Sequence, residues 1–331
     1  MMKRSFALFA IRLRDLPGLH QTALLSTSTS SSFAAPIPPN SKGQAVYNDI
    51  DFSASTDPSS NAMKRNQDPN AVHVVTGASR GIGLQFVKSL IDRTEGKIVA
   101  CCRSPENAHG LHTFLETMSL TDSLDRDRIE VLKLDIEDQT SIDELSNSIR
   151  NSYNRVDVLL NVAGLLGDGT STPGPERSLA KLDRDWIEKS MAVNVIGPVM
   201  LSQALSPLMA SPQRGKEDKR ATTLIANLSA RVGSISDNGL GGWYSYRFSK
   251  AALNQATRTM SHELKRKGTW TIALHPGTTD TDLSKPFQRN VQAERLFPVE
   301  FTVEKLLDVM DSMEEQNSGG LYDWAGKAIP F

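Results

Sequence analysis

A tyrosine and a lysine four residues apart, Tyr246 and Lys250, are the side chains in this sequence best suited to acid–base chemistry. Residues 251–255 are good helix formers, and residues four apart lie on one face of a helix. A neighbouring ammonium stabilises a phenolate and so lowers the pKa of a tyrosine toward neutral pH. Such a phenol can exchange a proton with a carbonyl or alcohol oxygen. A half-buried ring beside a solvated amine is the alternative, so the interpretation depends on the rest of the chain.

The composition limits the kinds of protein that this chain can be. Its 331 residues are 39% hydrophobic and 23% charged, enough for one large α/β domain or two modest ones. A formal net charge of −1 predicts no nucleic-acid partner. The two cysteines, Cys101 and Cys102, are adjacent within an apolar run, which favours buried thiols and a reducing compartment. No apolar run is long enough to predict a membrane span.

Residues 1–69 differ in composition from the rest of the chain. Residues 1–14 alternate basic and apolar side chains, and a run rich in serine and threonine follows, with prolines after it. This acid-poor composition is typical of an organelle transit peptide, and the early basic residues favour a mitochondrial address over a plastid one. A leader without an address, with the protein in the cytoplasm, is the alternative. We predict a transit peptide and unpacked linker over residues 1–69, and a folded domain over residues 70–331.

A glycine-rich segment joins the first strand-like run, which ends at Thr76, to a helix-like run that starts at Leu84. This order of strand, turn and helix is the context of a dinucleotide site. Gly77 permits the tight turn, Gly81 lets the backbone approach the pyrophosphate, and Gly83 allows close helix–strand packing. The helix N-terminus then offers free N–H groups to the phosphates. The alternative is a plain turn. The predicted cofactor contacts in this segment are Gly77, Ser79, Arg80, Gly81, Ile82 and Gly83.

An arginine stands where NAD-binding proteins carry an acidic residue. The second strand-like run, residues 97–102, leads directly to Arg103. An Asp or Glu in this neighbourhood binds the ribose 2′-hydroxyl of NAD, whereas a guanidinium attracts the 2′-phosphate of NADP. Arg80 adds a second positive charge within the glycine turn. The two arginines predict NADP(H) in preference to NAD(H); two solvated surface side chains are the alternative.

Two further strand-like runs end in residues that suit a ligand. One ends at Asp135, followed by Ile136, and this carboxylate can accept a hydrogen bond from an adenine amino group or cap a helix. The other ends at Asn161 and continues through Ala163 and Gly164, whose small side chains leave room for a flat ligand. Since the carboxyl ends of parallel strands meet at one edge of a sheet, we expect these residues to lie near the glycine turn.

The remaining segments complete an alternation of strands and helices. A helix-like segment over residues 183–209 carries Asn194 at its centre, either for packing or to hold a water or expose a carbonyl for proton transfer. Strand-like runs follow at residues 224–229 and 269–275. The alternation predicts a parallel, doubly wound α/β sheet with right-handed crossovers.

From about residue 71 to the C-terminus, these motifs together resemble the short-chain dehydrogenase/reductase family. Asn194, Tyr246 and Lys250 match its catalytic Asn, Tyr and Lys. The segment from Pro276 and Gly277 through Thr279 to Thr281 resembles the one that holds the nicotinamide carboxamide. The runs 231–235, 241–247 and 323–326 are similar to those of the C-factor (C-signal-like) subgroup. The resemblance implies a single Rossmann-type domain, strand order 3-2-1-4-5-6-7, and a homodimer or homotetramer formed through the tyrosine helix.

One departure from the family concerns its catalytic serine, the second serine of an N-I-S-S motif. This chain has Asn, Leu, Ser and Ala over residues 227–230, which pairs Ala230 with the catalytic position. Adjacent strand residues point to opposite faces, so Ser229 takes the role only if the backbone shifts. Ser229 is our candidate. Ser234, or a site that uses only Tyr, Lys and Asn, is the alternative.

The resemblance implies an NADP(H)-dependent oxidoreductase that interconverts a carbonyl and an alcohol on a small apolar substrate. Tyr246 is then the acid–base group, Lys250 lowers its pKa and binds the nicotinamide ribose, Asn194 completes a water relay, and a serine orients the carbonyl. The alternative is a nucleotide-binding regulatory or signalling protein of C-factor type with little or no turnover. The candidates for lining an apolar pocket are Leu165, Leu166, Trp243, Phe287 and Phe297.

Overall fold

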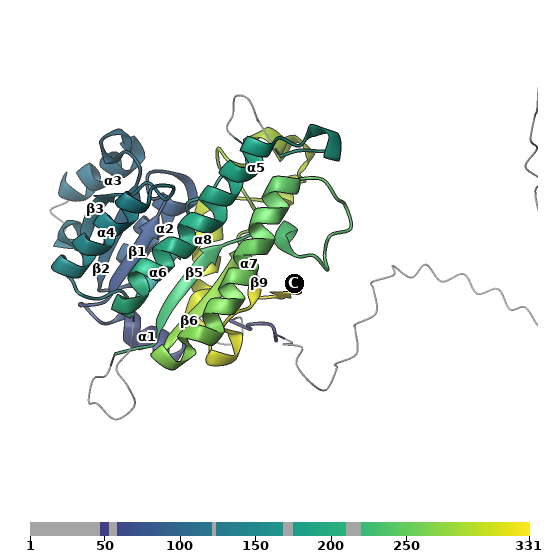
Figure 1. The fold of residues 1–331 in the computed structure, drawn as a ribbon. Coiled ribbons are helices and arrows are strands. Elements are labelled where there is room, and N and C mark those ends of the chain that lie inside the picture. The colour runs from purple at the N-terminus through teal and green to yellow at the C-terminus, as the bar shows by residue number, and fades with distance from the viewer. Residues whose placement is uncertain (1–46, 53–57, 121–123, 168–174, 210–219) are drawn as a thin grey trace, which may run out of the picture. The chain divides into compact units, whose positions relative to one another are not determined.

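A central eight-stranded sheet organises the protein (Figure 1). The computed structural model describes residues 47–52, 58–120, 124–167, 175–209 and 220–331. The strands lie in the order β10-β9-β6-β5-β4-β1-β2-β3, and all neighbours are parallel except β10 and β9. Their bounds are β1 Val72–Thr76, β2 Lys97–Cys102, β3 Ile129–Lys133, β4 Val158–Asn161, β5 Thr223–Leu228, β6 Thr269–His275, β9 Leu321–Asp323 and β10 Ala328–Ile329.

The predicted doubly wound fold and strand order are confirmed, with β9 as the seventh strand. The short antiparallel β10 extends the sheet beyond the predicted strands. A separate two-stranded sheet pairs β7 (Thr278–Thr279) with β8 (Leu296–Phe297). Short 3-10 helices connect the main elements: η1 Pro105–Asn107, η2 Leu124–Arg128, η3 Leu179–Lys181, η5 Arg231–Gly233, η6 Lys265–Lys267, η7 Lys285–Asn290, η8 Ala293–Arg295 and η9 Glu315–Asn317.

Helices cover both faces of the sheet. One apolar core lies beneath α2 (Gly81–Arg93), α3 (His109–Leu120) and α8 (Val299–Asp311). A second core lies beneath α4 (Gln139–Ser152), α6 (Gly197–Met209) and α7 (Tyr244–Leu264). Figure 1 shows α6 and α7 passing in front of the sheet. The helix α5 (Arg184–Met191) continues through the π-helix η4 (Ala192–Ile196) into α6.

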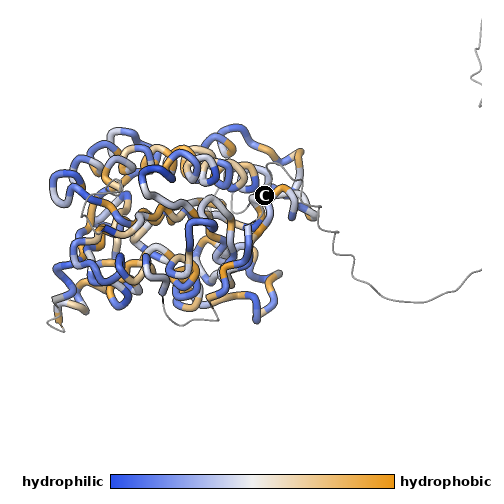
Figure 2. Tube along the Cα trace, turned by 90° about the horizontal axis from the view of Figure 1, so that it is seen from below, coloured by the Kyte–Doolittle hydropathy of each residue, from blue (hydrophilic) through white to orange (hydrophobic). Residues whose placement is uncertain are grey.

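The burial pattern explains why these segments form these elements. All five residues of β1 are buried, as expected for a central parallel strand covered on both faces. Along α2, Phe86, Val87, Leu90 and Ile91 are buried and form a stripe at helical spacing. Figure 2 shows the same alternation of hydrophilic and hydrophobic stretches along the helices.

The compact unit begins at Tyr47, earlier than the predicted domain start at residue 70. Ile50 is buried, and its N–H donates to the carbonyl of Gly326 at 2.7 Å. The helix α1 (Ser60–Asn66) follows, and its Arg65 and Asn66 side chains bind Asp311 of α8 at 3.3 and 3.2 Å. Composition did not reveal this segment because few of its residues are apolar. The predicted transit peptide falls on residues 1–46, which lie outside the described residues.

Among the described residues, the helical run Arg184–Met209 is long and apolar enough to cross a membrane by length and composition alone, a test that the core helix of a globular domain also passes. Leu201, Leu205 and Met209 are fully buried in the core beside the sheet. This packing accounts for the apolar composition of the run.

Candidate active site

The turn between β1 and α2 packs so closely that it requires glycine. Gly77 and Gly81 have φ angles of +67° and +55°, in the left-handed region. A Cβ on Gly83 would lie 2.2 Å from the carbonyl oxygen of Gly77, and one on Gly77 would lie 3.1 Å from the backbone of Ala163. Arg80 caps α2 without a side-chain hydrogen bond, which leaves the first-turn N–H groups available to an anion. These features fit the pyrophosphate of a dinucleotide.

The end of β4 meets the end of β1 at this turn. The hydroxyl of Thr76 accepts hydrogen bonds from the N–H groups of Val162 and Ala163, at 2.9 and 3.0 Å. A Cβ on Gly81 would lie 3.6 Å from the Thr281 side chain, so the turn also approaches the segment after β6. Ser79 and Ile82 are half-buried, and Ile82 packs against the core beneath α2.

The turn at Pro276 and Gly277 is supported by an aromatic cluster. Gly277 has a φ of +73°, and a Cβ there would lie 2.7 Å from the Phe297 ring. The Phe297 ring centroid lies 4.7 Å from that of Trp324 and 5.1 Å from that of Phe301. Phe297 therefore packs against the turn and its aromatic neighbours, whereas the sequence indicated a pocket wall. The Thr279 hydroxyl is also engaged, 3.0 Å from that of Thr302 in α8.

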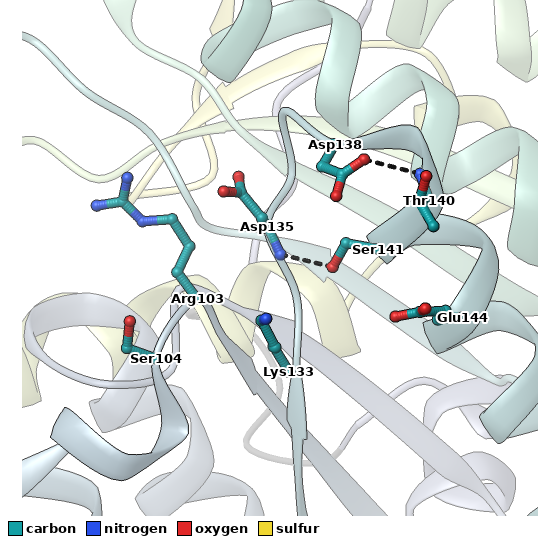
Figure 3. A pocket seen from close by; sticks show the side chains of 8 residues that line it. All are labelled: Arg103, Ser104, Lys133, Asp135, Asp138, Thr140, Ser141 and Glu144. Carbon is teal, nitrogen blue, oxygen red and sulfur yellow. Dashed lines mark hydrogen bonds between the residues drawn. The ribbon is translucent and has the colours of Figure 1, made fainter.

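Arg103 and Asp135 line one pocket of about 600 Å³ at the ends of β2 and β3. Figure 3 shows both side chains beside this space, with Lys133 at the end of β3. Sequence reasoning missed Lys133, although it ends the strand that pairs with β2 and lies opposite Cys102 in the register. The full lining is Arg103, Ser104, Lys133, Asp135, Asp138, Thr140, Ser141 and Glu144.

The carboxylate of Asp135 does not cap a helix. Its Oδ1 accepts the N–H of Glu137 at 3.1 Å, while Asp138 caps α4 by accepting the N–H of Thr140 at 3.0 Å. Arg80 does not line this pocket. Its exposed side chain lies 3.9 Å from Asp282, and an exposed pair of this kind contributes at most about 1 kcal/mol. The structure therefore places only Arg103 of the two predicted arginines beside Asp135.

Asn161 and Ile136 support the site from within the core. The Asn161 amide donates to Asn227 Oδ1 at 2.8 Å and to Ser202 Oγ at 3.3 Å, and the side chain is buried. The carbonyl oxygen of Ile136 would lie 2.4 Å from a Cβ on Gly197, so the start of α6 packs against it. The Asn161 side chain is thus directed into the layer of α6 and α7.

Tyr246 and Lys250 lie one turn apart near the start of α7. The Lys250 ammonium is buried, donates to the carbonyl of Leu228 at 2.8 Å, and lies 5.5 Å from the centroid of the Tyr246 ring. Among the described residues, none hydrogen-bonds the Tyr246 hydroxyl. The pair predicted from spacing is therefore brought together, with the hydroxyl left for another partner.

Burial shifts the pKa values of both groups, and the shift at Tyr246 is opposite to the predicted one. Burial raises the pKa of the Tyr246 phenol above its ordinary value, whereas a neighbouring ammonium was expected to lower it. Burial also lowers the pKa of Lys250 to about 8, because a charged ammonium is unfavourable in a site with little water. The predicted lowering of the tyrosine pKa is wrong for this structure, since desolvation is the cause that dominates at both groups. The phenol is therefore protonated at neutral pH.

Asn194 lies in the π-helix η4 and is fully buried. Its side chain exchanges two hydrogen bonds with the backbone of Leu165, both at 2.9 Å, and donates to Ser249 Oγ at 3.1 Å. The Ser249 hydroxyl in turn donates to the carbonyl of Tyr246 at 2.9 Å. A Cβ on Gly164 would lie 3.2 Å from Asn194 Oδ1 and 3.8 Å from Lys250 Nζ. Asn194, Tyr246 and Lys250 therefore converge, and Ser249 is a link that sequence reasoning missed.

The candidate serines have other partners. Ser229 is buried and donates to Asn254 Oδ1 at 2.6 Å. On α7, Asn254 lies two turns, or about 12 Å, beyond Tyr246. Ser234 donates to the carbonyl of Pro330 and accepts the N–H of Asp237 at 3.1 Å. Of the alternatives left by the sequence, the geometry favours a site that uses Tyr, Lys and Asn.

An aromatic wall adjoins Tyr246. The Trp243 ring centroid lies 6.3 Å from that of Tyr246 and 5.2 Å from that of Phe287. Trp243 has a φ of +56°, a strained conformation for a bulky residue and one found mainly at functional sites. Leu166 is buried, and Leu165 packs against the core beneath α6.

In the described part of the chain, no group of three His, Cys, Asp or Glu side chains is placed to hold a metal ion.

A Rossmann-type sheet with Tyr, Lys and Asn at the carboxyl ends of its strands defines a class of oxidoreductases. Residues 71–292 match the short chain dehydrogenase family, and the chain belongs to it. C-signal of Myxococcus xanthus is 32% identical over 53% of this chain and 93% of C-signal. An uncharacterized oxidoreductase of Schizosaccharomyces pombe is 28% identical over 79% of this chain and 98% of the relative.

The NADPH-bound carbonyl reductase from chicken fatty liver has a similar structure, with a TM-score of 0.67 and 28% identity over 79% of this chain and 99% of that one. The family and the similarity to C-signal predicted from the motifs are confirmed.

Replacing Lys250 with methionine should stabilise the protein at neutral pH. Because burial lowers the Lys250 pKa from 10.5 to about 8, the unfolded chain binds more protons here than the folded chain between these values. The contribution of Lys250 to the free energy of unfolding therefore rises with pH across this window. The advantage of Lys250→Met over wild type should fall by about 2–3 kcal/mol between pH 7 and pH 10. Urea unfolding at both pH values measures it; a pH-independent difference contradicts the buried ammonium.

Proposed function

We propose that the protein is an NADP(H)-dependent carbonyl reductase that acts on small apolar aldehydes or ketones. The observation that carries this proposal is that the Lys250 ammonium lies beside the Tyr246 ring. Asn194 binds the same helix turn through Ser249, which donates to the backbone carbonyl of Tyr246. A nucleotide-binding protein without turnover has no need of this arrangement.

The glycine turn and the α2 N-terminus would hold the pyrophosphate, and the pocket at Arg103 and Asp135 the adenosine end. The turn at Pro276 and Gly277, with Thr281, would hold the nicotinamide end. Bound NADPH supplies a hydride. Within the pocket, Arg103 and Lys133 are the cations that a 2′-phosphate would contact, and this supports NADP(H) over NAD(H).

Tyr246 would act as the general acid. A tyrosine of ordinary pKa is already protonated at neutral pH, and burial raises the pKa of Tyr246 further, so the phenol carries the proton that the oxygen of a reduced carbonyl needs. Lys250, with a pKa of about 8, can return a proton to the phenolate. The amide of Asn194 fixes the π-helix beside Lys250, which is where a water relay would start. With alanine at position 230, Tyr246 would also orient the carbonyl.

The wall of Trp243 and Phe287 supports an apolar substrate, because aromatic faces beside the proton donor favour an apolar carbonyl compound.

On α7, Tyr244 and the half-exposed Phe248 have ring centroids 5.9 Å apart on the outer surface. This surface supports a homodimer or homotetramer formed through α7. We retain the mitochondrial address as a proposal on composition alone.

A second candidate function is a nucleotide-binding regulator. The similarity to C-signal and the alanine at position 230 favour it. The two functions predict different results when NADPH oxidation is followed by stopped-flow absorbance with a panel of aldehydes and ketones. The reductase consumes NADPH with at least one apolar carbonyl compound, whereas the regulator binds NADPH and leaves the whole panel unreduced.

Reversing the charge at Arg103 should weaken NADPH binding selectively. A charge-assisted hydrogen bond contributes about 1.5–3 kcal/mol, so Arg103→Glu should raise the Kd for NADPH by about 10–100-fold and change that for NADH much less. Fluorescence titration with both cofactors measures this. Arg80→Glu is the matched comparison, and a smaller loss is expected because its side chain is exposed and paired with Asp282. Equal losses of both cofactors in Arg103→Glu contradict the assignment.

A further inference from the structure

Glu176 is a buried carboxylate that contacts the first turn of the tyrosine helix from a distant part of the chain. It lies between β4 and α5 and is 7% exposed. Its Oε2 accepts the N–H of Ser245 at 3.3 Å, and its Oε1 accepts the Ser245 hydroxyl. Its backbone carbonyl accepts the N–H of Trp243 at 2.6 Å. These three contacts all fall on the first turn of α7 or on the residue that precedes it.

The start of α7 needs this support because its own sequence supplies no side-chain cap. Trp243 occupies the N-cap position without a side-chain hydrogen bond. Gly241, Gly242 and Trp243 have φ angles of +65°, +65° and +56°, so three successive residues are left-handed. Glycine adopts this conformation readily, but a bulky residue such as Trp243 does so only where surrounding contacts hold it. Arg247 supplies part of that support, since its guanidinium donates to the carbonyls of Gly242 and Gly241 at 2.9 and 3.2 Å.

The same contacts fix the residues that would perform the chemistry. Ser245 lies between Trp243, which forms the aromatic wall, and Tyr246, which carries the phenol. A cap bound to Ser245 therefore sets the position of both side chains. An error of about 1 Å in the position of a reacting group can lower a rate by about 100-fold.

We infer that Glu176 is a positioning residue that acts through Ser245 to hold Tyr246 and Trp243 in their working geometry. Its catalytic consequence rests on the proposed reductase function, whereas its effect on the helix turn does not. Gln has nearly the same shape as Glu and can still accept a hydrogen bond from the Ser245 N–H. Glu176→Gln therefore keeps this hydrogen bond, whereas Glu176→Ala removes it.

The test uses three single variants of the full chain, Glu176→Ala, Glu176→Gln and Ser245→Ala. It also uses the double variant that carries both alanine substitutions. Hydrogen exchange of the peptide covering residues 243–250 reports the helix turn without requiring activity. We expect this peptide to exchange faster in Glu176→Ala than in wild type, and at about the wild-type rate in Glu176→Gln. The double variant should exchange no faster than the faster of the two single alanine variants. In the active enzyme, kcat should fall about tenfold or more in Glu176→Ala, with an unchanged Kd for NADPH and recovery in Glu176→Gln.

Asn66→Ala is the matched control, because it removes a buried side chain that binds the carboxylate of Asp311 in α8 and not the first turn of α7. It should lower the melting temperature and leave exchange at residues 243–250 unchanged. If Glu176→Ala does not fold, Ser245→Ala applies the same test. Unchanged exchange in both alanine variants, or a Glu176→Gln variant as impaired as Glu176→Ala, overturns the inference. A wild-type protein that reduces no carbonyl refutes only the proposed function.

Discussion

Replacing Tyr246 with phenylalanine should lower kcat by about 100–10,000-fold, the range lost when a general acid is removed. The phenol is protonated at neutral pH, as an ordinary tyrosine is, and burial raises its pKa further. Its ring lies beside the buried Lys250 ammonium. Phenylalanine keeps the ring against Trp243 and removes only the proton donor. Steady-state NADPH oxidation measures the loss, and fluorescence titration should show an unchanged Kd for NADPH.

Tyr244→Phe is the control for this substitution. Tyr244 lies two residues earlier on α7, where its ring contacts Phe248, and its hydroxyl has no assigned role. This variant should keep kcat within about twofold of wild type. A Tyr246→Phe enzyme that reduces the same carbonyl compound at the wild-type rate would show that another group donates the proton.

Removing residues 1–69 should destabilise the folded unit far more than removing residues 1–46. The longer deletion removes Arg65 and Asn66, which bind the buried Asp311, and Ile50, whose carbonyl packs against Gly326. Removing the partner of a buried charge costs up to about 3–5 kcal/mol. Asp311 keeps its ion pair with Arg93 at 2.7 Å, which reduces this cost, but the contacts of Asn66 and Ile50 are lost as well. A loss of about 4 kcal/mol corresponds to roughly 10 °C in melting temperature for a domain of this size.

Differential scanning calorimetry of the full chain and of the two deletions measures this loss. Arg65→Met in the full chain separates the ion pair from the remaining contacts, and it should account for part of the decrease. Ser59→Ala removes only the cap of α1, where Ser59 accepts the N–H of Ala62 at 3.2 Å, and should cost about 1 kcal/mol. A protein starting at residue 70 that melts within a few degrees of the full chain contradicts the boundary at Tyr47.

Most of the fold could be predicted because its signals are local. The alternation of buried strands with amphipathic helices, and the glycine turn between β1 and α2, are visible in windows of ten to twenty residues. The edge strand β10 was missed because it has only two residues. The contacts of Ile50 with Gly326 and of Arg65 with Asp311 were missed because they join residues more than 240 positions apart and depend on buried polar groups.

The candidate site was predictable in its residue types but not in its electrostatics. The spacing of Tyr246 and Lys250 follows from the helix period, whereas the pKa of each depends on burial, which the spacing does not indicate. The direction of Ser229 toward Asn254 depends on the strand pleat and on the packing of α7. Glu176 was missed because it lies in a polar segment and meets Ser245 only through the tertiary fold.

The most direct test of the account is transfer of deuterium from NADPH labelled at the nicotinamide C4 to a carbonyl substrate, followed by mass spectrometry of the product. A reductase that uses Tyr246 should form an alcohol heavier by one mass unit, with a primary isotope effect on a single turnover, and Tyr246→Phe should form almost none. Binding of the labelled NADPH without a deuterated alcohol from any aldehyde or ketone would contradict the account and favour a regulator.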